Sequence, residues 1–173
     1  MSPSRIFSSS GLIIIAFLIQ ESLVTRINFP IAGFSFYIAV LMGLISFEDR
    51  SGAVVIGFIG GIILDLSPTI DAPFGQWAFV MTLIGFLFAT NRESIGNFSS
   101  RPMALIALVA GGAMLSMVFF LMISALLGEN DGAFSQIVIK VLGNGFWTII
   151  FAPLIIPFLS LFHNASLTSR ERR

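Results

Sequence analysis

The sequence predicts an all-α membrane protein, a bundle of six transmembrane helices that forms a single domain over residues 1–173. Three observations support this fold class. Of the 173 residues, 56% are hydrophobic and only 10% are charged, whereas soluble domains carry about 25% charged residues. The mean hydropathy is +0.98. The apolar residues also form long runs, a pattern that excludes a soluble enzyme and a disordered tail.

Six segments approach the length of about 20 residues that a helix needs to cross the hydrocarbon layer. Helices are expected because an open sheet leaves backbone groups unpaired in lipid. Short stretches rich in charge, proline or glycine separate the segments. The predicted spans are Phe7–Val24, Pro30–Phe47, Ser51–Leu66, Phe74–Thr90, Pro102–Leu127 and Gln136–Phe162.

The first three spans are justified by what flanks them. Arg5 precedes the first, as in a signal peptide, but no small-residue cleavage site follows, so we interpret it as a retained helix. The second lies between the breaks Arg26–Pro30 and Glu48–Arg50. The third is the shortest, and it ends where the break Ser67–Pro73 begins.

The last three spans are bounded in the same way. The fourth begins after Pro73, and the break Asn91–Arg101 separates it from the fifth. The fifth and sixth are the longest, which predicts that they tilt or extend into the interface. Pro153 and Pro157 predict a kink near the end of the sixth.

Basic residues in the loops predict the orientation, because cytoplasmic loops carry the excess of Lys and Arg. With a cytoplasmic N-terminus, seven basic residues lie inside and two lie outside. The two outer ones are Arg26 and Lys140. An even number of spans then returns the C-terminus to the cytoplasm, so both termini are predicted to be cytoplasmic.

Composition argues against most kinds of chemistry. The chain has no Cys and one His, so a thiolate metal site, a cysteine nucleophile and a Ser-His-Asp triad are not expected. The nine basic and nine acidic residues give a net charge of zero, so the chain has no excess positive charge that would attract nucleic acid. No nucleotide-binding or hydrolase motif occurs. We therefore expect no catalytic residue, cofactor or metal site.

The third span carries a stripe of small residues that ends in an acidic residue. Gly57, Gly61 and Asp65 are four residues apart and share one helix face. Small residues let a neighbouring helix approach closely, as a partner or within the bundle. Two interpretations of Asp65 stay open: it caps the next turn at the end of this packing face, or it belongs to a polar site on the outer side.

The loop after this span is the most distinctive one in the chain. Pro68 and Pro73 fix its backbone, and Gly75 permits a tight approach. Phe74 and Trp77 are expected to be interfacial aromatics. Such a loop is either a structural connection between the third and fourth spans or a partner contact.

A polar stripe follows the sixth span. Gln136, Lys140, Asn144 and Thr148 recur every four residues, over about 18 Å of helix. Lys140, the only lysine, extends to the outer headgroups in one interpretation. In the other it forms an ion pair with Glu21 or Asp65. Together with Glu21, these residues form the predicted polar intramembrane stripe.

The stretches GAVVIGFIGGIILDLSP and APFGQWAFVMTLIGFLFA resemble the third and fourth spans of the rod shape-determining protein MreD family, in its actinobacterial form. Members show a glycine-rich span that ends in an acidic residue, a short loop with Pro and Gly, and a fourth span with a Gly-aromatic pair. The matching residues are Gly57, Gly60, Gly61, Asp65, Pro73, Phe74, Gly75, Gly85 and Phe86.

The resemblance implies a fold similar to the six-helix substrate-binding subunits of energy-coupling-factor transporters. It also implies a non-enzymatic membrane scaffold of the cell-elongation machinery, which supports peptidoglycan synthesis and cell shape in the bacterial cytoplasmic membrane. The implied partner is an MreC-like single-span protein. Membrane lipids, a RodA-type glycosyltransferase with its transpeptidase and a second copy of the chain are further candidates, and the resemblance leaves MreB open.

One alternative function follows from the residues. The polar stripe, with Glu21 and Asp65 near the outer side, could line a cavity of a solute-binding transporter subunit. Transporters often show broken helices and internal repeats around such a site, and this sequence shows no clear repeat. The scaffold is therefore the first prediction and the transporter subunit the second.

Overall fold

The computed structural model describes residues 3–27, 34–68, 72–91, 102–129, 132 and 134–166, and every regular element in these ranges is helical. The predicted all-α class is thereby confirmed. Asp71, Arg92, Arg101 and the basic tail, on which part of the predicted orientation rests, lie outside the described residues. The elements are α1 (Pro3–Ser22), the 3-10 turn η1 (Val24–Arg26), α2 (Phe36–Phe47), α3 (Arg50–Asp65), α4 (Gln76–Thr90), α6 (Pro102–Leu126) and α7 (Phe134–Ser166).

Three stretches of the described helices are long and apolar enough to cross a membrane by themselves: Arg5–Arg26, Pro102–Leu126 and Phe134–His163. This indicates a membrane protein. The other three described helices are shorter; α2 and α4 are also shorter than their predicted spans, whereas α3 has the predicted length of 16 residues. With 12, 16 and 15 residues, α2, α3 and α4 extend over about 18 to 24 Å, which is less than the hydrocarbon thickness of about 30 Å.

The start of α2 shows why this helix is shorter than the predicted span Pro30–Phe47. Phe34 and Ser35 are not helical, and the Oγ of Ser35 accepts a hydrogen bond from the backbone N–H of Ile38 at 3.2 Å. A serine in this N-cap position satisfies a donor of the first turn and fixes the start of the helix. Hydropathy continues through this region, so it does not reveal the boundary.

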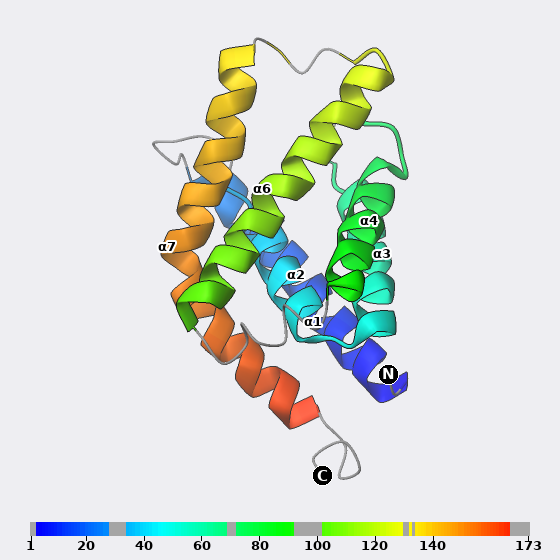
Figure 1. The fold of residues 1–173 in the computed structure, drawn as a ribbon, viewed down its shortest axis with the longest axis vertical. Helices are drawn as coiled ribbons and strands as arrows, with labels where there is room; N and C mark the ends of the chain where they lie inside the picture. Colours follow the sequence, from blue (N-terminus) through cyan, green and yellow to red (C-terminus); the bar gives the residue numbers. More distant parts are fainter. Residues whose placement is uncertain are drawn as a thin grey trace.

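Helix α2 forms the core of the bundle. Ten of its 12 residues are buried, and it packs against α1, α3, α6 and α7. Figure 1 shows α2 in the middle, with α3 and α4 on one side and the crossing pair α6 and α7 on the other. A helix that is apolar on all sides is expected in such a central position.

Helix α7 changes direction about halfway along its length (Figure 1). Pro153 and Pro157 lie within this helix, where a proline removes a backbone hydrogen bond and bends the axis. The first residues of α1 and the last helical residues of α7 lie at the same end of the molecule (Figure 1).

Candidate functional site

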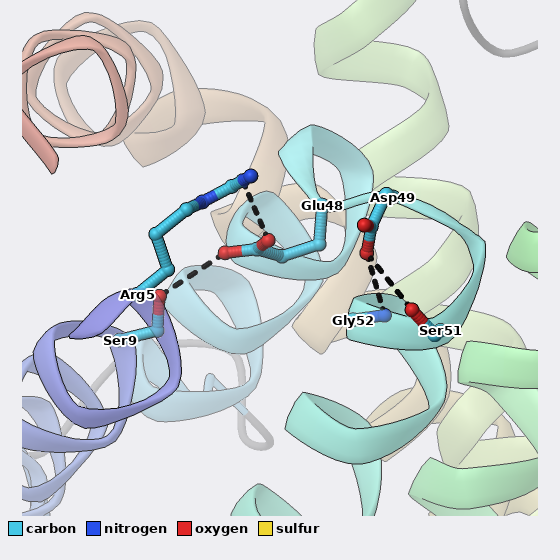
Figure 2. Close-up of polar contacts among 6 residues, drawn as sticks. All are labelled: Arg5, Ser9, Glu48, Asp49, Ser51 and Gly52. Atoms are coloured by element: carbon cyan, nitrogen blue, oxygen red, sulfur yellow. Dashed lines mark hydrogen bonds and ion pairs between the residues drawn. The ribbon is translucent and has the colours of Figure 1, made fainter. Parts of the chain in front are cut away.

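A buried ion pair joins the first turn of α1 to the corner between α2 and α3. The Nη2 of Arg5 donates to Oε2 of Glu48 at 2.7 Å, and the hydroxyl of Ser9 donates to Oε1 at 3.1 Å. The side chains of Arg5 and Glu48 are only 8% and 1% exposed. Figure 2 shows both α1 side chains converging on the carboxylate. Because an unpaired charge is costly when buried, this geometry fixes the position of α1.

Asp49, the next residue, points away from this pair and begins α3 (Figure 2). Its Oδ1 accepts from the backbone N–H of Gly52 at 2.7 Å and from the hydroxyl of Ser51 at 3.4 Å. Partial burial by itself raises the pKa of Asp49, but the Gly52 bond and the positive charge of Arg5 lower it, and the net direction is downward. Asp49 therefore stabilises the fold near neutral pH, and this contribution is lost as the pH falls through its lowered pKa.

The glycine stripe of the third span lies between α3 and α4. A Cβ atom on Gly57 would meet the backbone of Met81, and one on Gly61 would meet the backbone of Trp77 and Ala78. From the other side, a Cβ on Gly85 would meet the backbone of Ala53. The three glycines thus serve the close approach of α3 and α4 to each other, and this face is already covered within the chain.

Asp65 caps α4, as in the first of its two interpretations. Its Oδ1 accepts from the backbone N–H of Trp77 at 2.9 Å, and its Oδ2 accepts from that of Ala78 at 2.9 Å. A carboxylate in this position pairs two of the otherwise unpaired donors at a helix N-terminus and complements the helix dipole. Gly75 precedes the helix with φ +97°, a conformation that favours glycine.

Replacing Asp65 with alanine is expected to lower the free energy of unfolding by about 2 kcal/mol, because two hydrogen bonds to a charged acceptor are lost. Asp65→Asn keeps one acceptor oxygen and is expected to lose about half as much. Denaturant titration in mixed micelles measures both values. Glu129→Ala, at an exposed position, is the matched control, and an Asp65→Ala protein as stable as this control would contradict the capping role.

The loop residues fall into two groups. Pro68, Pro73 and Phe74 are exposed, the last by 72%. Trp77, expected at the interface, is only 5% exposed and stacks on Phe120 of α6 with ring centroids 4.3 Å apart. Trp77 is therefore a core residue, because α6 covers the start of α4, and its place at the membrane interface stays a prediction.

The predicted polar stripe of α7 divides at its middle. Asn144 and Thr148 are fully buried, whereas Gln136 and Lys140 are exposed. The Oδ1 of Asn144 accepts from the backbone N–H of Ser35 at 3.2 Å, and its Nδ2 donates to the carbonyl of Ala113 at 3.4 Å. Asn144 therefore joins three segments of the bundle, and the hydroxyl of Thr148 donates to its carbonyl at 2.6 Å.

Glu21 lies apart from this stripe. Its Oε1 accepts from the hydroxyl of Ser67 at 2.8 Å, so it connects the end of α1 to the residues that follow α3. The ion pair of Lys140 with Glu21 or Asp65, the second of the two interpretations of Lys140, is not present among the described residues. Equal predicted depth was the basis for that pairing, and depth does not determine the direction in which a side chain points.

Asn144→Ala is expected to lower the free energy of unfolding by about 1–3 kcal/mol, because it removes a fully buried amide and leaves the partly buried Ser35 N–H without its acceptor. Gln136→Ala, in the exposed half of the stripe, is expected to change it by less than about 0.5 kcal/mol. Both values come from unfolding in mixed micelles. Equal losses of unfolding free energy at the two positions would contradict the conclusion that only the buried half of the stripe stabilises the bundle.

Sequence reasoning missed two buried polar side chains, one at the C-terminal end of α2 and one within it. One is the Glu48 carboxylate, and the other is the only tyrosine, Tyr37, whose hydroxyl donates to the carbonyl of Gly60 at 2.7 Å. The predicted topology placed Arg5 and Glu48 on the same side of the membrane, which was the available signal for their pairing. Polar residues in an apolar chain usually find partners of this kind.

Comparison with known proteins adds no family assignment, since no family model, no curated protein and no solved structure matches this chain. Among the described residues, no group of three His, Asp or Glu side chains is arranged to hold a metal ion.

Proposed function

We propose that the chain crosses the bacterial cytoplasmic membrane six times, with both termini in the cytoplasm. The described ends of α1 and α7 at one end of the molecule support this topology (Figure 1). The Arg5–Glu48 pair places the α2–α3 corner at that same end, whereas the Asp65–Trp77 bond places the α3–α4 connection at the opposite end. Helices that alternate in direction in this way suit a polytopic bundle. The short α2 fits because neighbouring helices bury it.

We propose further that the protein is a non-enzymatic membrane scaffold of the cell-elongation machinery, similar to the MreD family. The observation that carries this proposal is that four residues of the resemblance share one structural task. Gly57, Gly61 and Gly85 allow α3 and α4 to pack closely. Asp65, at the end of α3, accepts hydrogen bonds from the first turn of α4. A rigid helical hairpin suits a protein that presents a fixed surface to other membrane helices.

The outer side of this hairpin is the surface that we assign to a partner. Phe79 and Phe86 of α4 are 60% and 54% exposed and lie seven residues apart, and Phe58 of α3 is 49% exposed. Large aromatic side chains on a rigid element are typical anchors of protein interfaces. A single apolar helix, as in an MreC-like single-span protein, is the partner that the resemblance implies. A RodA-type glycosyltransferase and a second copy of the chain are the next candidates.

Co-purification tests this assignment. The double substitution Phe79→Ala and Phe86→Ala is expected to reduce recovery of an MreC-like partner by about tenfold, because losing aromatic anchors costs at least 1–2 kcal/mol of binding. The matched control is Phe7→Ala with Phe146→Ala, two phenylalanines on other helices that are 83% and 50% exposed. The control is expected to retain the partner.

Two results would count against the proposal. If the wild-type chain recovers no single-span partner from membranes that contain one, the scaffold role is wrong. If both double variants lose the partner equally while their unfolding midpoints are unchanged, the α3–α4 surface is wrong. Thermal unfolding in detergent separates these results from a loss of fold.

The second candidate function, a solute-binding transporter subunit, would use outer polar residues around a cavity. The α7 polar stripe, Asp65 and Glu21 were expected there. Asp65, Glu21 and Asn144 of the stripe form hydrogen bonds within the chain. No specific contact therefore favours this alternative, and we place the scaffold first.

A further inference from the structure

An apolar groove runs between α1 and the second half of α7, with α2 at its base. Its volume is about 410 Å³. Leu12 and Ile19 lie along the α1 wall, Leu154 and Phe158 lie along the α7 wall, and Val40 of α2 lies at the base. Every lining residue is Ala, Val, Leu, Ile or Phe. The groove therefore offers no polar side chain to a solute.

The sequence explains why this groove forms. Helices α1 and α7 make few contacts with each other, although both pack against α2. Pro153 and Pro157 are exposed and do not line the groove. The change of direction that they introduce carries the second half of α7 across the lower part of the bundle (Figure 1). On the opposite wall, Ala16 is small and 3% exposed, so this part of α1 approaches α2 without filling the space.

The dimensions of the groove suit a small apolar ligand. From Phe151 to Leu159 the α7 wall is about 12 Å long at 1.5 Å per residue. The groove volume lies within the range of about 300–1,000 Å³ that small-ligand sites have. A single hydrocarbon chain suits a site of this size whose lining is entirely apolar.

We propose that this groove holds one acyl chain of a bilayer phospholipid. Both walls belong to helices long and apolar enough to cross a membrane, so the groove opens toward the hydrocarbon layer and acyl chains are its immediate surroundings. The lipid acts as a structural ligand that connects α1 to α7, which the protein itself joins weakly. This assignment does not depend on the scaffold function or on any protein partner.

Photolabelling of the full chain in vesicles tests the assignment. The vesicles contain phosphatidylethanolamine, phosphatidylglycerol and a trace of phosphatidylcholine with a diazirine near the end of one chain. Val40 is 5% exposed, while Ile149 and Ile150 on α7 are 51% and 46% exposed and lie outside the groove. Labelling of Val40 at least equal to that of Ile149 and Ile150 is expected. Absence of label at Val40, with both isoleucines labelled, would overturn the proposal.

A matched pair of variants sharpens the test. Ile15 lines the groove and Ile14 does not, although they are 55% and 49% exposed. Ile15→Phe is expected to reduce labelling of Val40 by about threefold, because the larger ring narrows a site of limited volume. Ile14→Phe is expected to leave it unchanged, and equal effects of the two variants would overturn the proposal. Loss of Val40 labelling in cell membranes, with Ile149 still labelled, would mean that a protein helix covers the groove and would also overturn it.

Discussion

Replacing Glu48 with alanine is expected to lower the free energy of unfolding by about 3–5 kcal/mol, which is the largest effect that we predict. The carboxylate is 1% exposed and accepts hydrogen bonds from Arg5 and Ser9. Its removal takes away the carboxylate with which the buried guanidinium of Arg5 forms its ion pair. Because Arg5 and Ser9 belong to α1, the first helix is expected to loosen first. Denaturant titration in mixed micelles gives the free energy, and proteolysis near the N-terminus reports the loosening.

Two controls show whether the loss of stability comes from breaking the ion pair or from any substitution near α1. The double substitution Arg5→Met and Glu48→Leu removes both charges together and is expected to restore stability to within about 1 kcal/mol of wild type, because well-packed apolar residues often replace a buried pair without loss. Arg26→Ala removes an exposed charge in η1, beyond the other end of α1, and is expected to change little. If Glu48→Ala and the double variant are equally unstable, the pair does not have the assigned role.

Helical structure was predictable because it depends on local runs of apolar residues. The predicted fifth span, Pro102–Leu127, and the observed α6, Pro102–Leu126, differ by one residue. Pro102 and Gly128 mark these limits in the sequence, since proline suits a first turn and glycine a helix end. The predicted Pro30–Phe47 differs from α2 because its start depends on the Ser35 cap. One capping residue within an apolar run hardly changes the mean hydropathy, so hydropathy does not reveal where the helix starts.

Contacts between distant segments were less predictable. Arg5 and Glu48 are 43 residues apart in the chain, and the orientation rule places them on one side of the membrane without pairing them. The burial of Trp77 was not predictable, because the ring of Phe120 that covers it comes from another helix. The α7 stripe divides for the same reason, since only its Asn144 half meets Ser35 and Ala113. Periodicity identifies a helix face, but the neighbouring helices determine what that face contacts.

The glycines provide the second large effect. Alanine at Gly57, Gly61 or Gly85 is expected to lower the free energy of unfolding by about 3 kcal/mol, at the upper end of the usual cost of overpacking. Each new methyl group would meet backbone atoms of the facing helix, which cannot rotate away, so α3 and α4 must separate. The resemblance does not enter this prediction, because it follows from the backbone positions alone.

Two other glycines give a graded control for that measurement. A Cβ at Gly43 would meet only the end of the Leu159 side chain, and one at Gly111 would meet nothing within 4 Å. Gly43→Ala is therefore expected to cost about 1 kcal/mol, since Leu159 can change its rotamer. Gly111→Ala is expected to add about 0.5–1 kcal/mol of stability through helix propensity. If all five positions lose the same stability, the loss reflects the replacement of any helical glycine, and close contact between α3 and α4 is not its cause.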